Sequence, residues 1–215
     1  MTDSDWLICE PSAHARALAG LDLFAVAAPA LRVLPAAERI LVVSRSRQPE
    51  REILLDRCAA DRVPIIIRPS GGGAVVLASG ALTVSVVAPT LGRSASPERE
   101  FRRFCTRLAE ALGACGVRSV VTRGVSDLCI GDRKIAGTSL RLWRGLVLFQ
   151  ASVLVDMDLD LLEHYLPMPT RQPEYRRDRG HRAFVTSLRE AGNAVSGEDL
   201  APAFVRALGP ELGAS

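Results

Sequence analysis

The chain has 215 residues, of which 48% are hydrophobic and 24% are charged, and its formal net charge is +3 at pH 7. This composition excludes disordered and collagen-like chains, no apolar run approaches the roughly 20 residues that cross a bilayer, and the charge is too small for a general nucleic-acid binder. We therefore expect a single cytoplasmic domain over residues 1–215, without a membrane or nucleic acid as a partner.

The first half of the chain mixes helical and strand-like segments. Helical periodicity covers Ala13–Phe24. Strands are predicted where β-branched residues gather, at Ile40–Ser44, Val63–Arg68 and Leu82–Ala88. The clearest helix is Pro97–Ala114, because Ser96 suits its N-cap and apolar residues recur at helical spacing along one stripe.

The second half contains consecutive strands. Strands are predicted at Val117–Thr122 and Leu146–Val155, and Gly124–Ser139 has the pattern of a strand, a tight turn and a strand. Because no helix separates them, we expect an α+β fold, with a mixed, largely antiparallel sheet flanked by helices, rather than a doubly wound sheet. The remaining helices are expected at Leu159–Tyr165, Arg182–Ala191 and Glu198–Leu208.

A run of glycines joins two predicted strands. The glycine loop, residues 68–74, has the sequence Arg-Pro-Ser-Gly-Gly-Gly-Ala. Consecutive glycines let backbone N–H groups approach a ligand closely, and successive amides can form a nest for an anion. The spacing matches neither a Walker loop nor a dinucleotide fingerprint. We expect a ligand-binding loop, and the alternative is a flexible hairpin turn.

Lys134 is the only lysine among 27 basic residues. It follows the predicted turn at Gly131-Asp132, and small residues follow it at 136–139. An ammonium is a compact charge with three donors, which suits holding a carboxylate and a phosphate oxygen together. We expect Lys134 to belong to a binding site, and the alternative is a solvated surface lysine.

Other polar groups give weaker signals. The odd number of cysteines, without CxxC spacing, favours free thiols, and the three scattered histidines predict no metal site. The cysteines are Cys9, Cys58, Cys105, Cys115 and Cys129. Six arginines and three acidic residues lie in Arg171–Glu190, which indicates either a solvated helix start or a docking patch for an anionic ligand or acidic partner.

The glycine loop and the lysine segment together resemble the lipoate–protein ligase and octanoyltransferase family of the biotin/lipoate ligase superfamily. Arg68 and Ser70–Val75 match its R-x-SGGG-AV loop. The residues that match its later strand pair are Gly124, Asp127, Leu128, Gly131, Lys134, Ile135 and Gly137. The resemblance covers about Arg39–Leu188. It implies the biotin/lipoate ligase catalytic-domain fold, which is shared with class II synthetases.

The resemblance also implies a site. Lys134 would be the catalytic residue, which binds the acyl group and its adenylate. The expected substrate- and adenylate-binding residues are Arg68, Ser70, Gly71, Gly72, Gly73, Ala74, Ser126, Asp127, Gly137, Thr138 and Ser152. The apolar strands Leu82–Val87 and Leu146–Val155 would form the wall of an acyl tunnel.

Ligases of this family use ATP and Mg²⁺ to attach lipoate or octanoate to a lysine of a lipoyl-domain acceptor, such as a 2-oxoacid dehydrogenase subunit or a glycine cleavage carrier protein. We expect this activity here. Many ligases carry a C-terminal accessory domain, for which this chain is too short, so the expectation is either a separate accessory chain as a further partner or an activity that does without one.

Three positions depart from the family pattern. Leu77-Ala78 replaces a His-Asp pair, Gln150-Ala151 replaces His-Gly, and Thr122 stands where cysteine-dependent transferases carry their cysteine. The last difference disfavours a thioester mechanism. Three alternatives stay open: cofactor-independent transfer between carrier domains, a non-catalytic protein that binds acyl groups or lipoyl domains, and biotin ligation.

Overall fold

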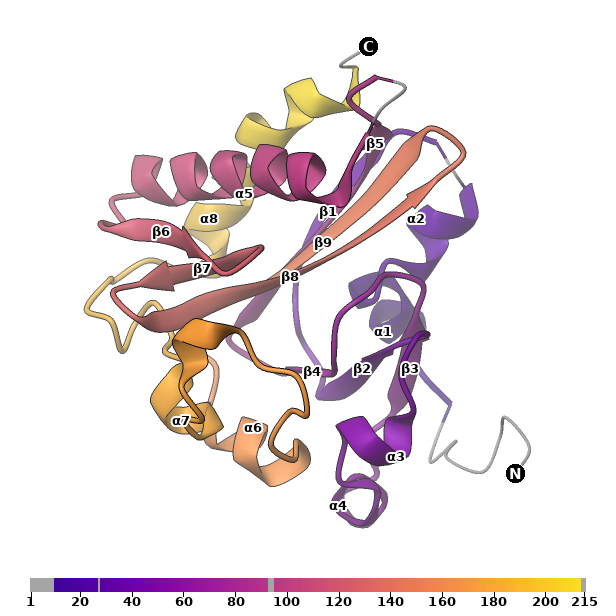
Figure 1. The fold of residues 1–215 in the computed structure, drawn as a ribbon, viewed down its shortest axis with the longest axis vertical. Coiled ribbons are helices and arrows are strands. Elements are labelled where there is room, and N and C mark those ends of the chain that lie inside the picture. Colours follow the sequence, from indigo (N-terminus) through magenta and orange to yellow (C-terminus); the bar gives the residue numbers. More distant parts are fainter. Residues whose placement is uncertain (1–9, 27, 93–94, 214–215) are drawn as a thin grey trace.

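The computed structural model describes residues 10–26, 28–92 and 95–213. A large sheet crosses the molecule, with α5 (Pro97–Ala114) and α8 (Gly197–Leu208) on one side (Figure 1). A smaller sheet and the short helices α1 (Ala13–Leu18), α6 (Asp160–Tyr165) and α7 (His181–Phe184) lie on the other side. Within the described ranges, no helix is long and apolar enough to cross a membrane.

The large sheet has the strand order β1-β5-β9-β8-β7-β6, and all of its neighbouring pairs are antiparallel. Its strands are β1 (Ala30–Pro35), β5 (Ala81–Pro89), β6 (Val120–Arg123), β7 (Asp127–Ile130), β8 (Arg133–Trp143) and β9 (Leu146–Leu154). The smaller sheet has the order β3-β2-β4, with β2 (Ile40–Ser44) parallel to β3 (Ile65–Arg68) and antiparallel to β4 (Val75–Leu77). The expected α+β fold with a mixed, largely antiparallel sheet is confirmed.

The two long helices agree with the sequence analysis. The Ser96 side chain caps α5 by accepting from the Arg99 N–H, and Ser196 and Asp199 form a capping box at α8. The buried stripe of α5 packs onto the large sheet, where the rings of Phe104 and Phe149 stack with their centroids 4.8 Å apart. This core leaves the opposite face of the sheet available for a site.

The short helices differ in part from expectation. They are α1 (Ala13–Leu18), α2 (Leu21–Val26), α3 (Pro49–Glu52), α4 (Leu55–Ala60), α6 (Asp160–Tyr165), α7 (His181–Phe184), and the 3-10 helices η1 (Glu174–Arg176) and η2 (Gly209–Leu212). The single helix expected over Ala13–Phe24 is broken at Gly20, whose φ is +66°.

The helix expected over Arg182–Ala191 is wrong beyond Phe184. After Phe184 the backbone forms hydrogen bonds with the large sheet instead. Thr186 N donates to Lys134 O at 2.9 Å, and Leu188 N donates to Leu154 O at 2.8 Å. These tertiary hydrogen bonds replace the helical ones.

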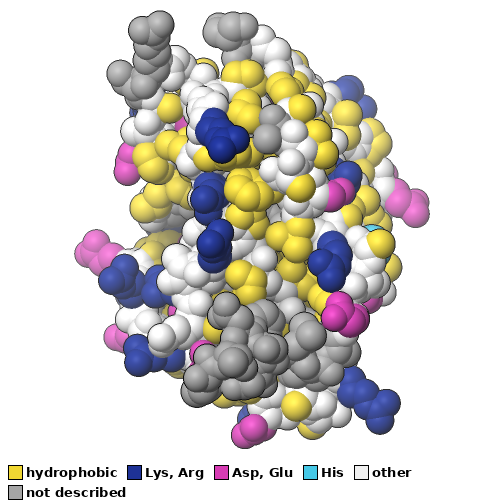
Figure 2. All heavy atoms as spheres, turned by 90° about the vertical axis from the view of Figure 1, so that its right-hand side faces the viewer, with side chains coloured by type: hydrophobic (Ala, Val, Ile, Leu, Met, Phe, Trp, Pro, Cys, Tyr) yellow, Lys and Arg dark blue, Asp and Glu magenta, His cyan; other side chains and the backbone are white. Residues whose placement is uncertain are grey.

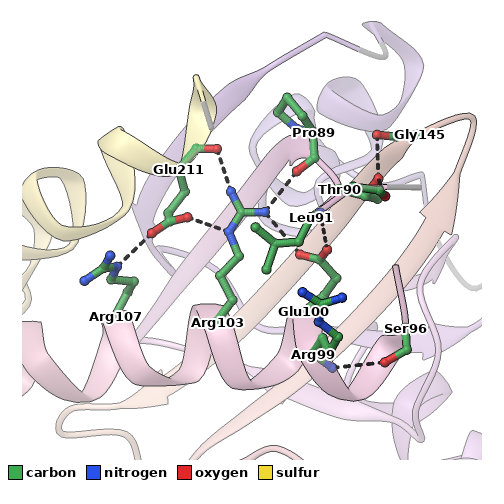
Figure 3. Close-up of polar contacts among 11 residues, drawn as sticks. Pro89, Thr90, Leu91, Ser96, Arg99, Glu100, Arg103, Arg107, Gly145 and Glu211 are labelled. Atoms are coloured by element: carbon green, nitrogen blue, oxygen red, sulfur yellow. Dashed lines mark hydrogen bonds and ion pairs between the residues drawn. The ribbon is translucent and has the colours of Figure 1, made fainter. Parts of the chain in front are cut away.

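A buried ion-pair network joins α5 to η2 near the C-terminus (Figure 3). The Glu211 carboxylate accepts from Arg103 and from Arg107, whose Nε lies 2.7 Å away. Arg103 also pairs with Glu100 at 3.1 Å, and Glu100 accepts from the Leu91 N–H at 2.7 Å. The side chains of Glu100, Arg103 and Glu211 are all buried. The network therefore holds η2 and the residues after β5 against α5.

The face that includes α1 and α2 carries hydrophobic side chains in its upper half, with basic side chains between them (Figure 2). Phe24 of α2 and Trp143 at the end of β8 are both half-buried, and their ring centroids lie 4.8 Å apart. The guanidinium of Arg141 lies over the Phe24 ring, 5.2 Å from its centroid. Aromatic and cation–π contacts thus attach α2 to the large sheet.

Candidate active site

Lys134 lies on β8, opposite Cys129 of β7, at an irregularity in the ladder. Ile135 is an extra residue there, which makes a β-bulge. Ile135 and Ala136 are both fully buried in the core beneath α5 and α8. Because the bulge directs two consecutive side chains into that core, Lys134 and Gly137 share the opposite face of the strand.

The ammonium of Lys134 is held by a carboxylate. Lys134 Nζ lies 2.7 Å from Oδ1 of Asp127, and the Tyr175 hydroxyl donates to Oδ2 of the same carboxylate at 2.7 Å. The side chains of Lys134 and Asp127 are 25% and 19% exposed, so the pair is largely shielded but can be reached by a ligand. Burial raises the pKa of Tyr175 and the Asp127 charge raises it further, so Tyr175 stays a hydrogen-bond donor.

The glycine loop crosses the smaller sheet and is not a hairpin. Strands β3 and β4 lie on opposite sides of β2, so the loop passes over the end of β2. The buried Arg68 guanidinium donates to the carbonyl oxygens of Val42 at 3.1 Å and of Gly71 and Gly73 at 2.8 Å each. Gly72 has φ +97°, and a Cβ there would lie 2.9 Å from Arg68 Nη2, so this position requires glycine.

The environment of Arg68 shows that it supports the loop from inside. Burial lowers the pKa of Arg68 to about 10, which still leaves it charged at neutral pH. Its Nε atom is buried, and no hydrogen-bond acceptor lies within reach of it among the described residues. Arg68 therefore braces the glycine loop and keeps one donor unused.

A buried polar cluster attaches the glycine loop to the large sheet. Ser70 Oγ lies 2.9 Å from Ser139 Oγ and donates to Gln150 Oε1 at 2.6 Å. Gln150 Nε2 donates in turn to the Ala19 carbonyl at 2.8 Å. Gln150, one of the positions that depart from the family pattern, thus connects the loop, β9 and α1.

Two cavities meet at Lys134. The inner cavity, of about 120 Å³, lies between the two sheets, and the outer cavity, of about 240 Å³, lies between α3, α6 and residues 166–185. Residues that line both are Gly73, Ala74, Val75, Lys134, Gly137 and Ser152. One water needs only about 10–15 Å³ of such volume, so the inner cavity has room for a ligand of several heavy atoms.

The walls of the two cavities differ in chemistry. Apolar residues of the inner wall are Leu18, Ala19, Val42, Ala74, Val75, Leu77 and Ala151. The outer wall carries the basic side chains of Arg51, Lys134, Arg171 and Arg176 and the imidazole of His181, together with two carboxylates, Glu52 and Asp127, and several apolar residues. Burial lowers the pKa of His181, so its ring is neutral at pH 7. The apolar side of the inner cavity suits an alkyl chain, and the four basic side chains of the outer wall, which outnumber its two carboxylates, suit an anion.

The structure brings together most of the residues expected at the site. Those that line the inner cavity are Arg68, Gly72, Gly73, Ala74, Lys134, Gly137, Thr138 and Ser152, and Asp127 lines the outer cavity. Ser70 and Gly71 are instead bonded to the large sheet behind the loop, and Ser126 lines neither cavity. The Thr138 hydroxyl donates to the Ser126 carbonyl at 2.9 Å.

The expected acyl-tunnel wall is wrong in most of its residues. From Leu82–Val87 the inner cavity takes Thr83, and from Leu146–Val155 it takes residues 150–152. Leu82 and Val84 belong to the core beneath α5 and α8. Both faces of the large sheet are covered here, so apolar residues can lie on either side of its strands, and the sequence does not show which residues face the cavity.

The arginine-rich segment is divided between internal contacts and the outer cavity. Arg171 and Arg176 line that cavity, so the expected docking patch for an anionic ligand stays a prediction. Arg176 is buried, Arg179 pairs with Asp132 at 2.8 Å, and Arg182 pairs with Glu190 at 2.7 Å. Sequence analysis missed Tyr175 in this segment, because its partner Asp127 is 48 positions away and no local pattern signals the contact.

The described cysteines are free thiols, as expected, and Cys9 lies outside the described residues. Cys58, Cys105 and Cys129 are buried, and Cys115 is half-buried. Burial raises the pKa of Cys58 to about 11 and that of Cys105 to about 12, and it also raises the pKa of Cys129. These three buried thiols therefore lack the lowered pKa that activates a nucleophile.

Known sequences show the family. The model of the lipoyl protein ligase A/B catalytic domain matches residues 23–209. A lipoate–protein ligase of Streptococcus pyogenes serotype M5 is 30% identical over 128 residues, which are 60% of this chain and 37% of that protein. Lipoate–protein ligase 2 of Staphylococcus aureus is 25% identical over 149 residues, which are 69% and 43% of the two chains. The matched region thus spans less than half the length of these curated relatives.

Solved structures share the fold. Lipoate-protein ligase A bound with ATP has a TM-score of 0.71 and 25% identity, covering 86% of this chain and 72% of that one. A bi-partite lipoate protein ligase from Thermoplasma acidophilum, described with its E2 lipoyl domain, has a TM-score of 0.77 and 24% identity, covering 94% and 80%. Since the family match covers most of the sequence, the chain belongs to the lipoyl protein ligase A/B catalytic-domain family.

Proposed function

We propose that this protein activates lipoate or octanoate with ATP and transfers the acyl group to a lysine of a lipoyl-domain acceptor. The observation that carries the proposal is the place of Lys134, at the junction of a cavity with an apolar side and a second cavity that carries three arginines. The relatives named as lipoate–protein ligases and the solved relative that holds ATP support this activity.

The acyl chain would occupy the inner cavity, with its carboxylate at Lys134 and the nucleotide phosphates in the outer cavity. Asp127 uses one of the three ammonium protons of Lys134, which leaves two donors, one for the acyl carboxylate and one for the α-phosphate. Two unit charges 4 Å apart interact by about 4 kcal/mol at an effective dielectric constant of 20. Lys134 can therefore hold the two reacting anions together.

The proposed reaction has two steps. A carboxylate oxygen of the acid attacks the α-phosphorus of ATP, and the bond to pyrophosphate breaks; Lys134 stabilises the charge on the α-phosphoryl oxygens. The acceptor lysine amine then attacks the acyl carbonyl, an amide bond forms, and AMP leaves with the electron pair of the broken bond. The apolar inner cavity keeps water away from the acyl chain.

Mg²⁺ fits this proposal as a counterion of the nucleotide. It is usually bound by one or two carboxylates together with substrate phosphates. Among the described residues no group of three or more His, Cys, Asp or Glu side chains could hold a metal ion by itself. Both Asp127 and Glu52 line the outer cavity, but Asp127 is closely bonded to Lys134 and Tyr175, whereas Glu52 makes a longer ion pair with Arg47, at 3.8 Å. We therefore assign Glu52 as the carboxylate available to Mg²⁺.

The acceptor and any accessory chain would bind outside these cavities. The Thermoplasma relative is bi-partite and was described with an E2 lipoyl domain, which supports both kinds of partner for this chain. A mechanism through a cysteine thioester is disfavoured, because Cys129, the cysteine paired with Lys134 across the ladder, is buried with a raised pKa.

Lipoate-dependent exchange between ATP and pyrophosphate tests the first step without an acceptor. The wild-type protein should catalyse exchange, and Lys134→Ala should reduce its rate by about 100-fold or more, as removal of a transition-state donor does. Arg99→Ala is the matched control, because Arg99 is an exposed cation on α5, on the other side of the sheet. Absence of exchange, combined with transfer from an acylated carrier domain, would replace ATP activation with carrier-to-carrier transfer.

A further inference from the structure

Tyr175 is linked to Lys134 through a shared partner. Its hydroxyl bonds Oδ2 of Asp127, while Oδ1 of the same carboxylate bonds Lys134 Nζ, each at 2.7 Å. The Cys129 thiol, 3.5 Å from the Tyr175 oxygen, completes a row of polar groups that runs from η1 to the junction of the two cavities. Tyr175 itself lines neither cavity.

The Tyr175 ring is held rigidly. Its centroid lies 5.1 Å from that of Phe184, and a Cβ at Gly124 would lie 3.5 Å from the ring. The segment that carries it has a second, separate anchor: Arg179 donates to the Tyr175 carbonyl at 3.0 Å and pairs with Asp132 in the β7–β8 turn at 2.8 Å. The segment is therefore attached both at the hydroxyl and at this turn.

The carboxylate needs such a support. Rotation about the terminal bond of an aspartate is soft and roughly two-fold, and a lysine ammonium ends a flexible four-carbon stem. An ion pair between two such groups does not by itself define where the ammonium lies. When the Tyr175 hydroxyl occupies Oδ2, Asp127 presents Oδ1 to Lys134 in one orientation.

We propose that Tyr175 is a positioning residue, which fixes the Lys134 ammonium at the junction of the two cavities by orienting Asp127. It touches neither reacting group. The effect on catalysis rests on the proposed function, whereas the effect on Lys134 itself does not.

The sole lysine provides a direct test. In Tyr175→Phe, which removes only the hydroxyl, Asp127 can turn away from Lys134 and expose the amine. Acetylation of Lys134 by an amine-specific succinimidyl ester at fixed pH, followed by mass spectrometry of its peptide, should accelerate about threefold or more, since a hydrogen bond to a charged group is lost. Asp132→Ala removes the side-chain ion pair of the other anchor, while Arg179 keeps its 2.9 Å bond to the carbonyl of residue 132, and it should leave this rate unchanged. Equal rates in wild type and Tyr175→Phe, or equal acceleration in both variants, would overturn the proposal.

Kinetics and folding complete the test. Tyr175→Phe should lower kcat for adenylate formation about tenfold, in line with the effect of losing a supporting partner, with an unchanged KM for ATP. A KM that rises while kcat is retained would contradict positioning. If the wild type forms no adenylate, the proposed function fails and the acetylation rates still decide the role of Tyr175. Should Tyr175→Phe unfold, Asp127→Asn breaks the same chain of contacts and should also accelerate acetylation.

Discussion

Replacing Gly137 with alanine would displace the Lys134 ammonium with little other change. An added Cβ at this position would lie 3.0 Å from Lys134 Nζ and 3.1 Å from its Cε, closer than an ordinary van der Waals contact. Gly137 is not among the positive-φ glycines, so the backbone accepts alanine without strain. Lys134 must therefore move by a few tenths of an ångström, which disturbs its 2.7 Å contact with Asp127.

The size of the effect follows from this displacement. A misplacement of a reacting group by about 1 Å can lower a reaction rate about 100-fold. A shift of a few tenths of an ångström should therefore lower the rate of adenylate formation about tenfold, which raises the activation free energy by about 1.4 kcal/mol. Stability should change by less than about 1 kcal/mol, because the strand keeps its hydrogen bonds.

Pyrophosphate exchange and thermal unfolding would be measured on the same samples. Gly113→Ala is the control, because it introduces the same methyl group in α5 with no heavy atom within 4 Å. A Gly137→Ala protein that retains full activity would refute the reasoning, since it would show that the position of the ammonium is not critical.

Two further predictions concern stability. Burial would raise the pKa of Glu211, but Arg107 and Arg103 lower it below its ordinary value of 4.5. The Glu211 carboxylate thus contributes its full stabilisation above pH 4.5, and this contribution is lost as the pH falls through the folded-state pKa. Glu211→Gln should therefore lower Tm at pH 7, and the difference from the wild-type Tm should shrink in acid. A difference that stays constant across pH would contradict this. Arg68→Lys removes the guanidinium that bonds the carbonyls of Gly71 and Gly73, so it should lower the free energy of unfolding in urea by about 2–3 kcal/mol. An unchanged urea midpoint would show that the glycine loop does not need these bonds.

The sequence located the site better than it assigned individual roles. The glycine loop and Lys134 could be found because each is an unusual local pattern, three glycines in one case and a sole lysine in the other. The role of Arg68 could not, because nothing local distinguishes a guanidinium that faces a ligand from one that bonds loop carbonyls. The crossing of the loop over β2 depends on strand pairing between distant segments.

Long-range contacts also explain the remaining differences. The residues after Phe184 are expected from the sequence to continue a helix, but Thr186 and Leu188 bond the beginning of β8 and the end of β9 instead. Tertiary hydrogen bonding thus overrides the local preference. The bulge at Ile135, which places Lys134 and Gly137 on one face, is specified by packing against α5 and not by a turn motif. The bond from Tyr175 to Asp127 likewise joins residues 48 positions apart, so no local pattern predicts it.

The central claim is that Lys134 supports ATP-dependent acylation of a protein lysine. Its most direct test is the intact mass of a purified lipoyl domain incubated with this protein, lipoate or octanoate, and ATP with Mg²⁺, with a parallel sample that lacks ATP and another that contains Lys134→Ala. The account predicts the acyl mass increase in the complete wild-type reaction and in neither of the others. An equal increase without ATP, or with Lys134→Ala, would contradict it.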